Sequence, residues 1–152
     1  MVYGGAAKPF VRAWKERGLR PFATHAARLV AETVPRPAAN VITYIPPDGD
    51  RSLKRGHHPA QRLARELASE WGIECLPLLG RARPVARQAG LSLPERQRNV
   101  RGAFAATPPL SGAVALVDDV YTTGATVNAA AAALRAAGSG DVHVVTFART
   151  VR

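Results

Sequence analysis

Apolar positions recur at helical spacing in four stretches of this 152-residue chain. Proline or glycine stands at the end of each stretch, where these residues stop helices. The four predicted helices span residues 7–18, 21–35, 59–72 and the stretch from 126 to 138. The first two lie within residues 1–37, ahead of any predicted strand, and are candidates for part of a hood over a site.

Short apolar runs that are rich in β-branched residues predict the strands. These runs are residues 41–45, 73–79, 113–117 and 142–148. Because strands alternate with helices, the pattern predicts an α/β fold with a twisted, mostly parallel sheet flanked by helices. A chain of 152 residues has the length of one domain, so we expect residues 1–152 to form a single one.

The composition is that of a globular protein with a packed core. Hydrophobic residues make up 47% of the chain, enough for a packed core, and no run reaches the ~18 apolar residues of a membrane span. Residues 1–10 lack the apolar centre of a secretion signal, so a cytoplasmic location is expected. The single cysteine, Cys75, excludes an internal disulfide and a cysteine-based zinc site within this chain, and the four histidines show no metal-ligand spacing.

The charge is strongly basic, with 21 Lys and Arg against 11 Asp and Glu and a net charge of +10. An arginine-rich surface suits an anionic ligand or nucleic acid, although codon bias toward arginine gives the same excess. Residues 80–101 concentrate arginine in a segment without a clear apolar period. We expect this segment to be a flexible basic loop, either a lid or a disordered stretch. Its arginines are Arg81, Arg83, Arg87, Arg96, Arg98 and Arg101.

The chemistry concentrates in residues 113–128, AVALVDDVYTTGATVN. A buried strand is expected to end at Asp118 and Asp119, and a threonine- and glycine-rich loop then leads into a helix. Ligands of open α/β sheets bind beyond the carboxyl ends of strands, and a helix N-terminus favours an anion. Carboxylates repel phosphate but accept hydrogen bonds from sugar hydroxyls, so a ribose phosphate suits both halves of this segment.

Three other interpretations explain the segment less well. An ordinary turn with a capped helix explains the loop but not two carboxylates at the end of a buried strand. A phospho-receiver metal site needs a later strand-end aspartate, and Asp141, the only later acidic residue, precedes a strand instead. A P-loop is excluded because no Gly-Lys-Ser/Thr follows a glycine-rich loop.

The segment VALVDDVYTTGAT resembles the phosphoribosyl-pyrophosphate (PRPP) motif of type I phosphoribosyltransferases. Nearly the whole chain resembles the narrower ComF family of competence-associated proteins. The matching segments are residues 3–7, 14–18, 53–64, 88–92, 95–96, 99–100 and 102–104. Two features depart from that family. It commonly begins with a four-cysteine zinc module, and this sequence starts after the place of that module, so either the protein has none or the sequence is a truncated form; in addition, His57-His58-Pro59 replace the family's usual Phe-Asn-Gln.

The resemblance implies roles for individual residues. Asp118 and Asp119 would hold the ribose hydroxyls as the catalytic pair, and the loop would bind the 5-phosphate through Thr122, Thr123, Gly124, Ala125 and Thr126. Pyrophosphate would be contacted by residues after the first strand and by arginines of the 80–101 segment. These are Asp48, Gly49, Asp50, Arg51, Lys54, Arg55, Arg81 and Arg83. Mg²⁺ is expected as the cofactor, held mainly by PRPP oxygens with Asp118 and Asp119 as candidate protein ligands.

Two functions follow from these features. One is an enzyme that binds PRPP with Mg²⁺ and displaces pyrophosphate with an acceptor that no residue identifies. The other is a non-catalytic DNA-uptake factor that keeps the ribose-phosphate pocket and binds nucleic acid or a partner helicase. The intact acidic pair beside an intact loop favours the enzyme, while the basic charge favours the binding factor; no membrane partner is expected, and a homodimer is left open.

Overall fold

The computed structural model describes Pro9, residues 13–14, 20–47, 58–85, 92–107 and 111–150. Most of the predicted first helix lies outside these residues, although Pro9, Ala13 and Trp14 are helical. The predicted pyrophosphate turn from Asp48 to Arg55 and the lid residue Arg87 also lie outside the described part of the chain.

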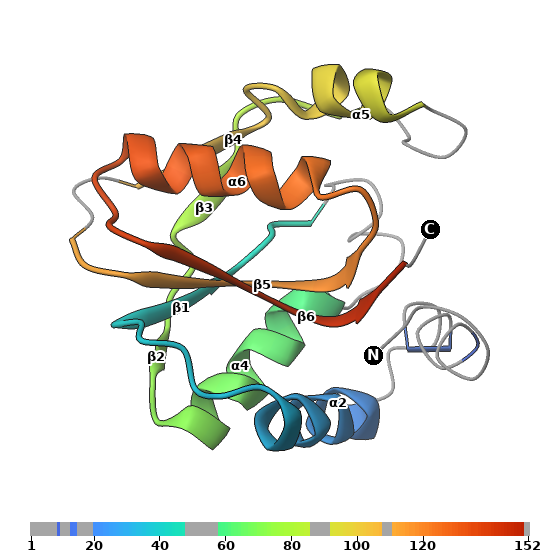
Figure 1. Cartoon of the computed structure of the whole chain (residues 1–152), viewed down its shortest axis with the longest axis vertical. Coiled ribbons are helices and arrows are strands. Elements are labelled where there is room, and N and C mark those ends of the chain that lie inside the picture. The colour runs from blue at the N-terminus through green and yellow to red at the C-terminus, as the bar shows by residue number, and fades with distance from the viewer. Residues whose placement is uncertain are drawn as a thin grey trace.

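Four parallel strands form the main sheet, which confirms the predicted α/β class. They are β1 (Val41–Tyr44), β2 (Glu74–Cys75), β5 (Val114–Tyr121) and β6 (Val142–Arg149). The strand order is β2-β1-β5-β6, and β1 and β5 are the central pair (Figure 1). The inner residues of β5, from Val114 to Val117, are fully buried, as expected for a strand covered on both faces.

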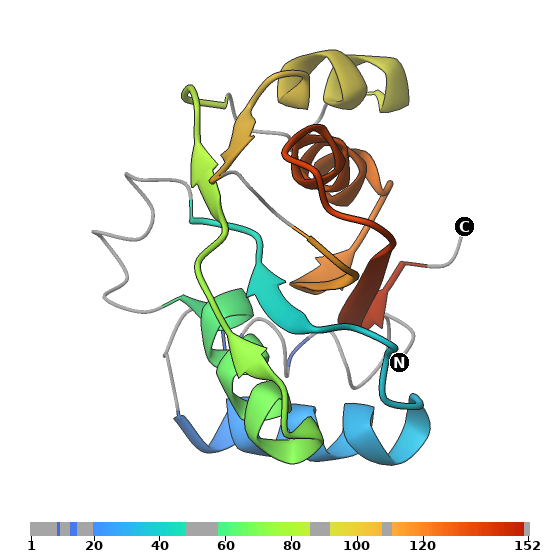
Figure 2. The ribbon, with the colours of Figure 1, turned by 90° about the vertical axis from the view of Figure 1, so that its left-hand side faces the viewer.

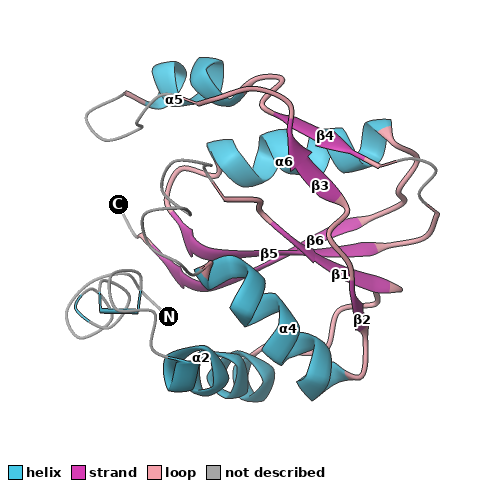
Figure 3. Cartoon of the chain, turned by 180° about the vertical axis from the view of Figure 1, so that it is seen from behind, coloured by secondary structure: helices cyan, strands magenta, loops and turns pink. Residues whose placement is uncertain are grey.

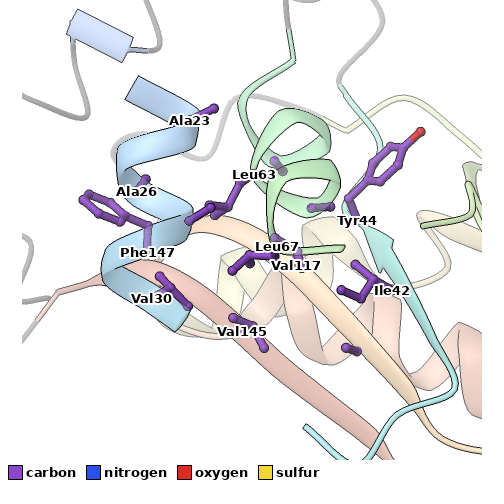
Figure 4. Packing of buried hydrophobic residues seen from close by; sticks show 14 of the residues in the cluster. Ala23, Ala26, Val30, Ile42, Tyr44, Leu63, Leu67, Val117, Val145 and Phe147 are labelled. Atoms are coloured by element: carbon purple, nitrogen blue, oxygen red, sulfur yellow. The ribbon is translucent and has the colours of Figure 1, made fainter. Parts of the chain in front are cut away.

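Helices α2 (Arg20–Thr33) and α4 (Pro59–Trp71) lie together on one face of this sheet (Figure 1). The sequence sets both ends of α4, because Pro59 suits the first helical turn and Gly72 adopts the left-handed conformation (φ 62°) just after the last. Figure 4 shows the apolar core between these helices and the strands, with Ala26, Leu63 and Leu67 of the helices facing the strand residues. Trp14 joins this core, with its ring edge-on to that of Phe147 at 6.1 Å.

The opposite face carries α6 (Ala125–Ala136), whose buried alanines, Val127 and Leu134 pack against a second cluster. An outer layer lies beside α6 and extends beyond it at α5, as Figures 2 and 3 show. It consists of the antiparallel strands β3 (Leu79–Arg81) and β4 (Phe104–Ala106) together with the short helix α5 (Leu93–Val100). Within the described residues, no helix is long and apolar enough to cross a membrane.

The predicted single strand over residues 73–79 is wrong, because the structure divides it into β2 and β3 in different sheets. The amide of Leu76 still donates to the carbonyl of Ile42 (2.9 Å), but Pro77 follows and has no amide hydrogen to continue the ladder. Leu79 pairs instead with Ala106 of β4. Cys75 is half-buried beside the core, and this burial raises the pKa of its thiol.

The prediction of a loop without regular structure over residues 80–101 is also wrong for the residues that the structure describes, 80–85 and 92–101. β3 reaches Arg81, and α5 begins at Leu93. A capping box starts α5: the amide and hydroxyl of Ser92 donate to the Glu95 carboxylate at 2.7 and 2.6 Å. These bonds lower the pKa of Glu95. The Ser-x-x-Glu spacing with Pro94 was a visible helix-start signal, so this helix was predictable. Closure of the segment over a ligand stays a prediction.

Leu67 and Leu29 form a matched pair for testing this core, because Leu67 is fully buried and Leu29 is 44% exposed. Leu67→Ala should lower the free energy of unfolding in urea by about 2–5 kcal/mol, the usual cost of emptying a buried leucine site. Leu29→Ala should change it by less than about 1 kcal/mol. Equal losses in the two variants would contradict the described packing of α4.

Candidate functional site

The order of the strands places a crevice at the carboxyl ends of β1 and β5. The chain passes from β1 through α4 to β2 on one side, and from β5 through α6 to β6 on the other. The two connecting helices cover opposite faces of the sheet (Figure 1). Loops therefore diverge between β1 and β5, which is where open α/β sheets bind ligands.

β5 extends further along the sheet than β1 does. The last bond between them runs from the Ile45 amide to the Val117 carbonyl (3.0 Å), and Pro46 and Pro47 cannot donate any more. β5 continues to Tyr121 with β6 as its partner, in the register Asp118↔Thr146 and Tyr121↔Arg149. The expectation that the strand ends at the acidic pair is wrong, because these residues belong to the strand and β1 does not pair with them.

The two aspartates occupy successive positions of a strand, where side chains point to opposite faces. Both are half-buried. Asp118 lines a pocket with the loop that follows, whereas Asp119 does not line it. The Asp118 carboxylate also accepts a hydrogen bond from the Asp119 amide at 2.8 Å. The sequence predicted two equivalent carboxylates, but the structure gives only Asp118 a place beside the loop.

The pocket is formed by the end of β5, the loop and the first turn of α6. Its lining residues are Asp118, Val120, Tyr121, Thr122, Gly124, Thr126 and Val127. Gly124 is the N-cap of α6, and Thr123 accepts a hydrogen bond from the Ala125 amide through its hydroxyl at 3.4 Å. A helix N-terminus carries partial positive charge, so this end of the pocket favours an anion. Of the predicted loop residues, Thr123 and Ala125 are beside the pocket without lining it.

Tyr121 and Gly124 are in close contact across the loop. Gly124 has a left-handed backbone (φ 76°), and a Cβ placed there would lie 2.8 Å from Cζ of Tyr121. The ring therefore occupies the space that a side chain at position 124 would need. The sequence predicted Gly124 as part of the phosphate loop but did not single out Tyr121.

Arg81 and Arg83 make contacts within the protein. Arg81 donates to the Pro46 carbonyl (3.2 Å), and its guanidinium lies 4.5 Å from the centre of the Phe104 ring. This places Arg81 beside the carboxyl end of β1, next to the crevice. Arg83 donates to the carbonyls of Asn99 (2.9 Å) and Arg101 (2.6 Å) at the end of α5, so here it holds that helix end.

The structure explains the departure from the ComF family pattern at His58 and Pro59, the two residues of the 57–59 segment that it describes. His58 is the N-cap of α4, and its Nδ1 accepts a hydrogen bond from the Gln61 amide at 3.3 Å. An asparagine at this position would supply a side-chain oxygen for the same bond. His58 therefore keeps the capping function at this position with a different acceptor, and Pro59 takes the first helical position.

The donor set of the site suits Mg²⁺ held mainly by a ligand. No group of three His, Cys, Asp or Glu side chains is arranged to hold a metal ion within the described ranges. Asp118 offers hard carboxylate oxygens at the pocket, and Mg²⁺ is commonly bound through one or two carboxylates together with substrate phosphates.

No family model matches the chain. Competence protein F of Haemophilus influenzae is 30% identical over 141 residues, covering 90% of this chain and 62% of the relative. The DNA utilization protein YhgH of Escherichia coli K12 is 35% identical over 115 residues, covering 72% of this chain and 49% of the relative. The chain is homologous to these proteins.

This homologue of competence protein F and YhgH spans about half to three fifths of the length of those relatives. Solved phosphoribosyltransferases share its fold. Glutamine PRPP amidotransferase of Bacillus subtilis, complexed with ADP and GMP, matches with a TM-score of 0.56 and 26% identity over 82% of this chain and 26% of that one. Adenine phosphoribosyltransferase of Thermoanaerobacter pseudethanolicus matches with a TM-score of 0.55 and 11% identity over 94% and 86%. The predicted resemblance to type I phosphoribosyltransferases and ComF proteins is confirmed.

Gly124→Ala tests the contact between Gly124 and Tyr121. Gly72→Ala is the matched control, because Gly72 also has a positive φ but has nothing within 4 Å of an added Cβ. The control should cost about 1 kcal/mol of unfolding free energy for the backbone conformation alone. Gly124→Ala should cost about 1–3 kcal/mol more through overpacking, measured by urea unfolding. Adding Tyr121→Ala should remove that excess, and an excess that survives it would contradict the contact.

Proposed function

We propose that this chain binds the ribose 5-phosphate part of PRPP, with Mg²⁺, and supports displacement of pyrophosphate by an acceptor. The observation that carries the proposal is the shared pocket: the carboxylate of Asp118 and the N-terminus of α6 line one space at the carboxyl end of β5. A ligand that bears hydroxyls at one end and a phosphate at the other matches both.

The phosphate end is assigned to the loop. The first amides of a helix have no acceptor within the helix, and the dipole places partial positive charge there. Thr122 and Thr126 add hydroxyl groups to the lining. Gly124 lets the backbone turn with a positive φ. These groups form a neutral anion site that needs no lysine.

The ribose end is assigned to Asp118. An ionised carboxylate accepts hydrogen bonds from two neighbouring hydroxyls, and such charge-assisted bonds are the stronger class. Asp119, which does not line the pocket, is assigned the supporting role of fixing Asp118 through its amide. The two aspartates therefore have unequal roles: the Asp118 carboxylate faces the ligand, and the backbone amide of Asp119 holds that carboxylate in place.

The transfer step requires stabilisation of pyrophosphate as its bond to ribose C1 breaks and the acceptor bond forms. Mg²⁺ bound to the pyrophosphate oxygens would neutralise the charge that develops on this leaving group. Arg81 lies beside the end of β1, where its position is set by Pro46 and Phe104, and supplies fixed positive charge at that edge.

Single substitutions of the two aspartates test this assignment. Asp118→Asn should weaken binding of ribose 5-phosphate by about 1.5–3 kcal/mol, the scale of a hydrogen bond to a charged group, in calorimetric titration. Asp119→Asn should weaken it less. Asp141→Asn, an exposed aspartate at the start of β6, is the matched control and should bind like the parent protein. Unchanged affinity in Asp118→Asn would contradict the ribose assignment.

A second function, binding of nucleic acid, is favoured by the charge of the chain and by the names of its relatives. The net charge is +10. Arg98 and Arg101 are exposed at the end of α5, in the layer furthest from the sheet (Figure 1). Phosphate contacts from such side chains supply affinity without sequence preference.

Replacing both Arg98 and Arg101 by alanine separates the two functions. If this surface binds single-stranded DNA, the variant should lose affinity and the slope of log K against log salt should flatten by about 1.4, or ~0.7 for each lost contact. Its affinity for ribose 5-phosphate should not change. Fluorescence anisotropy at several salt concentrations measures the slope, and an unchanged slope would contradict a nucleic-acid surface at α5.

A further inference from the structure

Thr150, the residue after β6, makes hydrogen bonds to the start of the phosphate loop. Its amide donates to the carbonyl of Tyr121 at 2.9 Å. Its hydroxyl donates to the carbonyl of Thr122 at 3.0 Å, with a longer contact of 3.4 Å to that of Tyr121. Thr150 therefore donates hydrogen bonds to two successive carbonyls of the segment that leads into the pocket.

The direction of these carbonyls matters for an anion site. A backbone carbonyl oxygen carries partial negative charge and repels phosphate, whereas the amides of the loop attract it. Only the three residues 122–124 separate β5 from α6, and a peptide group in this loop that flips would exchange an attractive group for a repulsive one. A donor fixed on the carbonyl oxygen opposes that flip.

The other end of the loop is held by different contacts. The carbonyl of Gly124 accepts from the Asn128 amide at 2.8 Å within α6, and the Tyr121 ring packs on Gly124. Both ends are therefore fixed before a ligand arrives, one by α6 and one by Thr150. Such preorganisation raises affinity because less ordering accompanies binding.

We propose that Thr150 is a positioning residue for the phosphate site. Its hydroxyl acts through the hydrogen bond to the carbonyl of Thr122, which fixes the direction of that carbonyl. This inference rests on the proposed function, since it concerns the same loop. Thr150 lies 28 residues from Thr122 and outside the acidic and threonine-glycine motif, so the sequence pattern alone does not indicate it.

Thr150→Val and Thr150→Ser test the hydroxyl directly. Valine keeps the branched shape and the backbone amide but removes the hydroxyl, while serine keeps the hydroxyl. In calorimetric titration with ribose 5-phosphate, Thr150→Val should weaken binding by about 3- to 10-fold, and Thr150→Ser should stay within about 2-fold of the parent protein. Thr24→Val, on α2 on the opposite face, is the matched control and should bind like the parent.

A purely structural role at the end of β6 would give a different result. Equal weakening in the valine and serine variants, or parent-like binding in Thr150→Val, would overturn the inference. Absence of ribose 5-phosphate binding by the parent protein would instead overturn the proposed function. Thermal unfolding without ligand checks that each variant folds. If the valine variant does not fold, Thr150→Ala removes the same hydroxyl and replaces it in the test.

Discussion

The missing amide hydrogen of Pro47, the next position after Ile45 that would donate to β5, determines where this sheet opens. The bond from Ile45 to Val117 is the last between β1 and β5, because proline cannot donate to the ladder. β5 continues beside β6 to Tyr121. Among the residues that the structure describes, no strand pairs with the β1-facing edge of β5 from Asp118 onward, at the point where the connecting helices leave for opposite faces.

The features of the site depend on this opening. Asp118 lines the pocket at the point where β1 no longer pairs with β5, and the loop after Tyr121 turns directly into α6. The outer layer is joined to the same place, since Arg81 of β3 donates to the Pro46 carbonyl. The opening thus holds a pocket with one carboxylate and one helix N-terminus.

Much of the fold was predictable because local signals agree with tertiary structure. Proline and glycine mark both ends of α4, and short β-branched runs mark β1, β5 and β6. The loop and Asp118 followed from a contiguous motif. The division of residues 73–79 between two sheets depends on pairing with β4, and the role of Thr150 depends on contacts 28 residues away, so neither could be predicted from local sequence. The α5 helix was missed although its capping box is visible in the sequence.

A crystal structure with ribose 5-phosphate tests the central claim most directly, since it locates the phosphate and the sugar at once. The account predicts phosphate oxygens within hydrogen-bond distance of the Gly124, Ala125 and Thr126 amides, with ribose hydroxyls on the Asp118 carboxylate. An ordered ligand elsewhere on the protein, with none in this pocket, would contradict it.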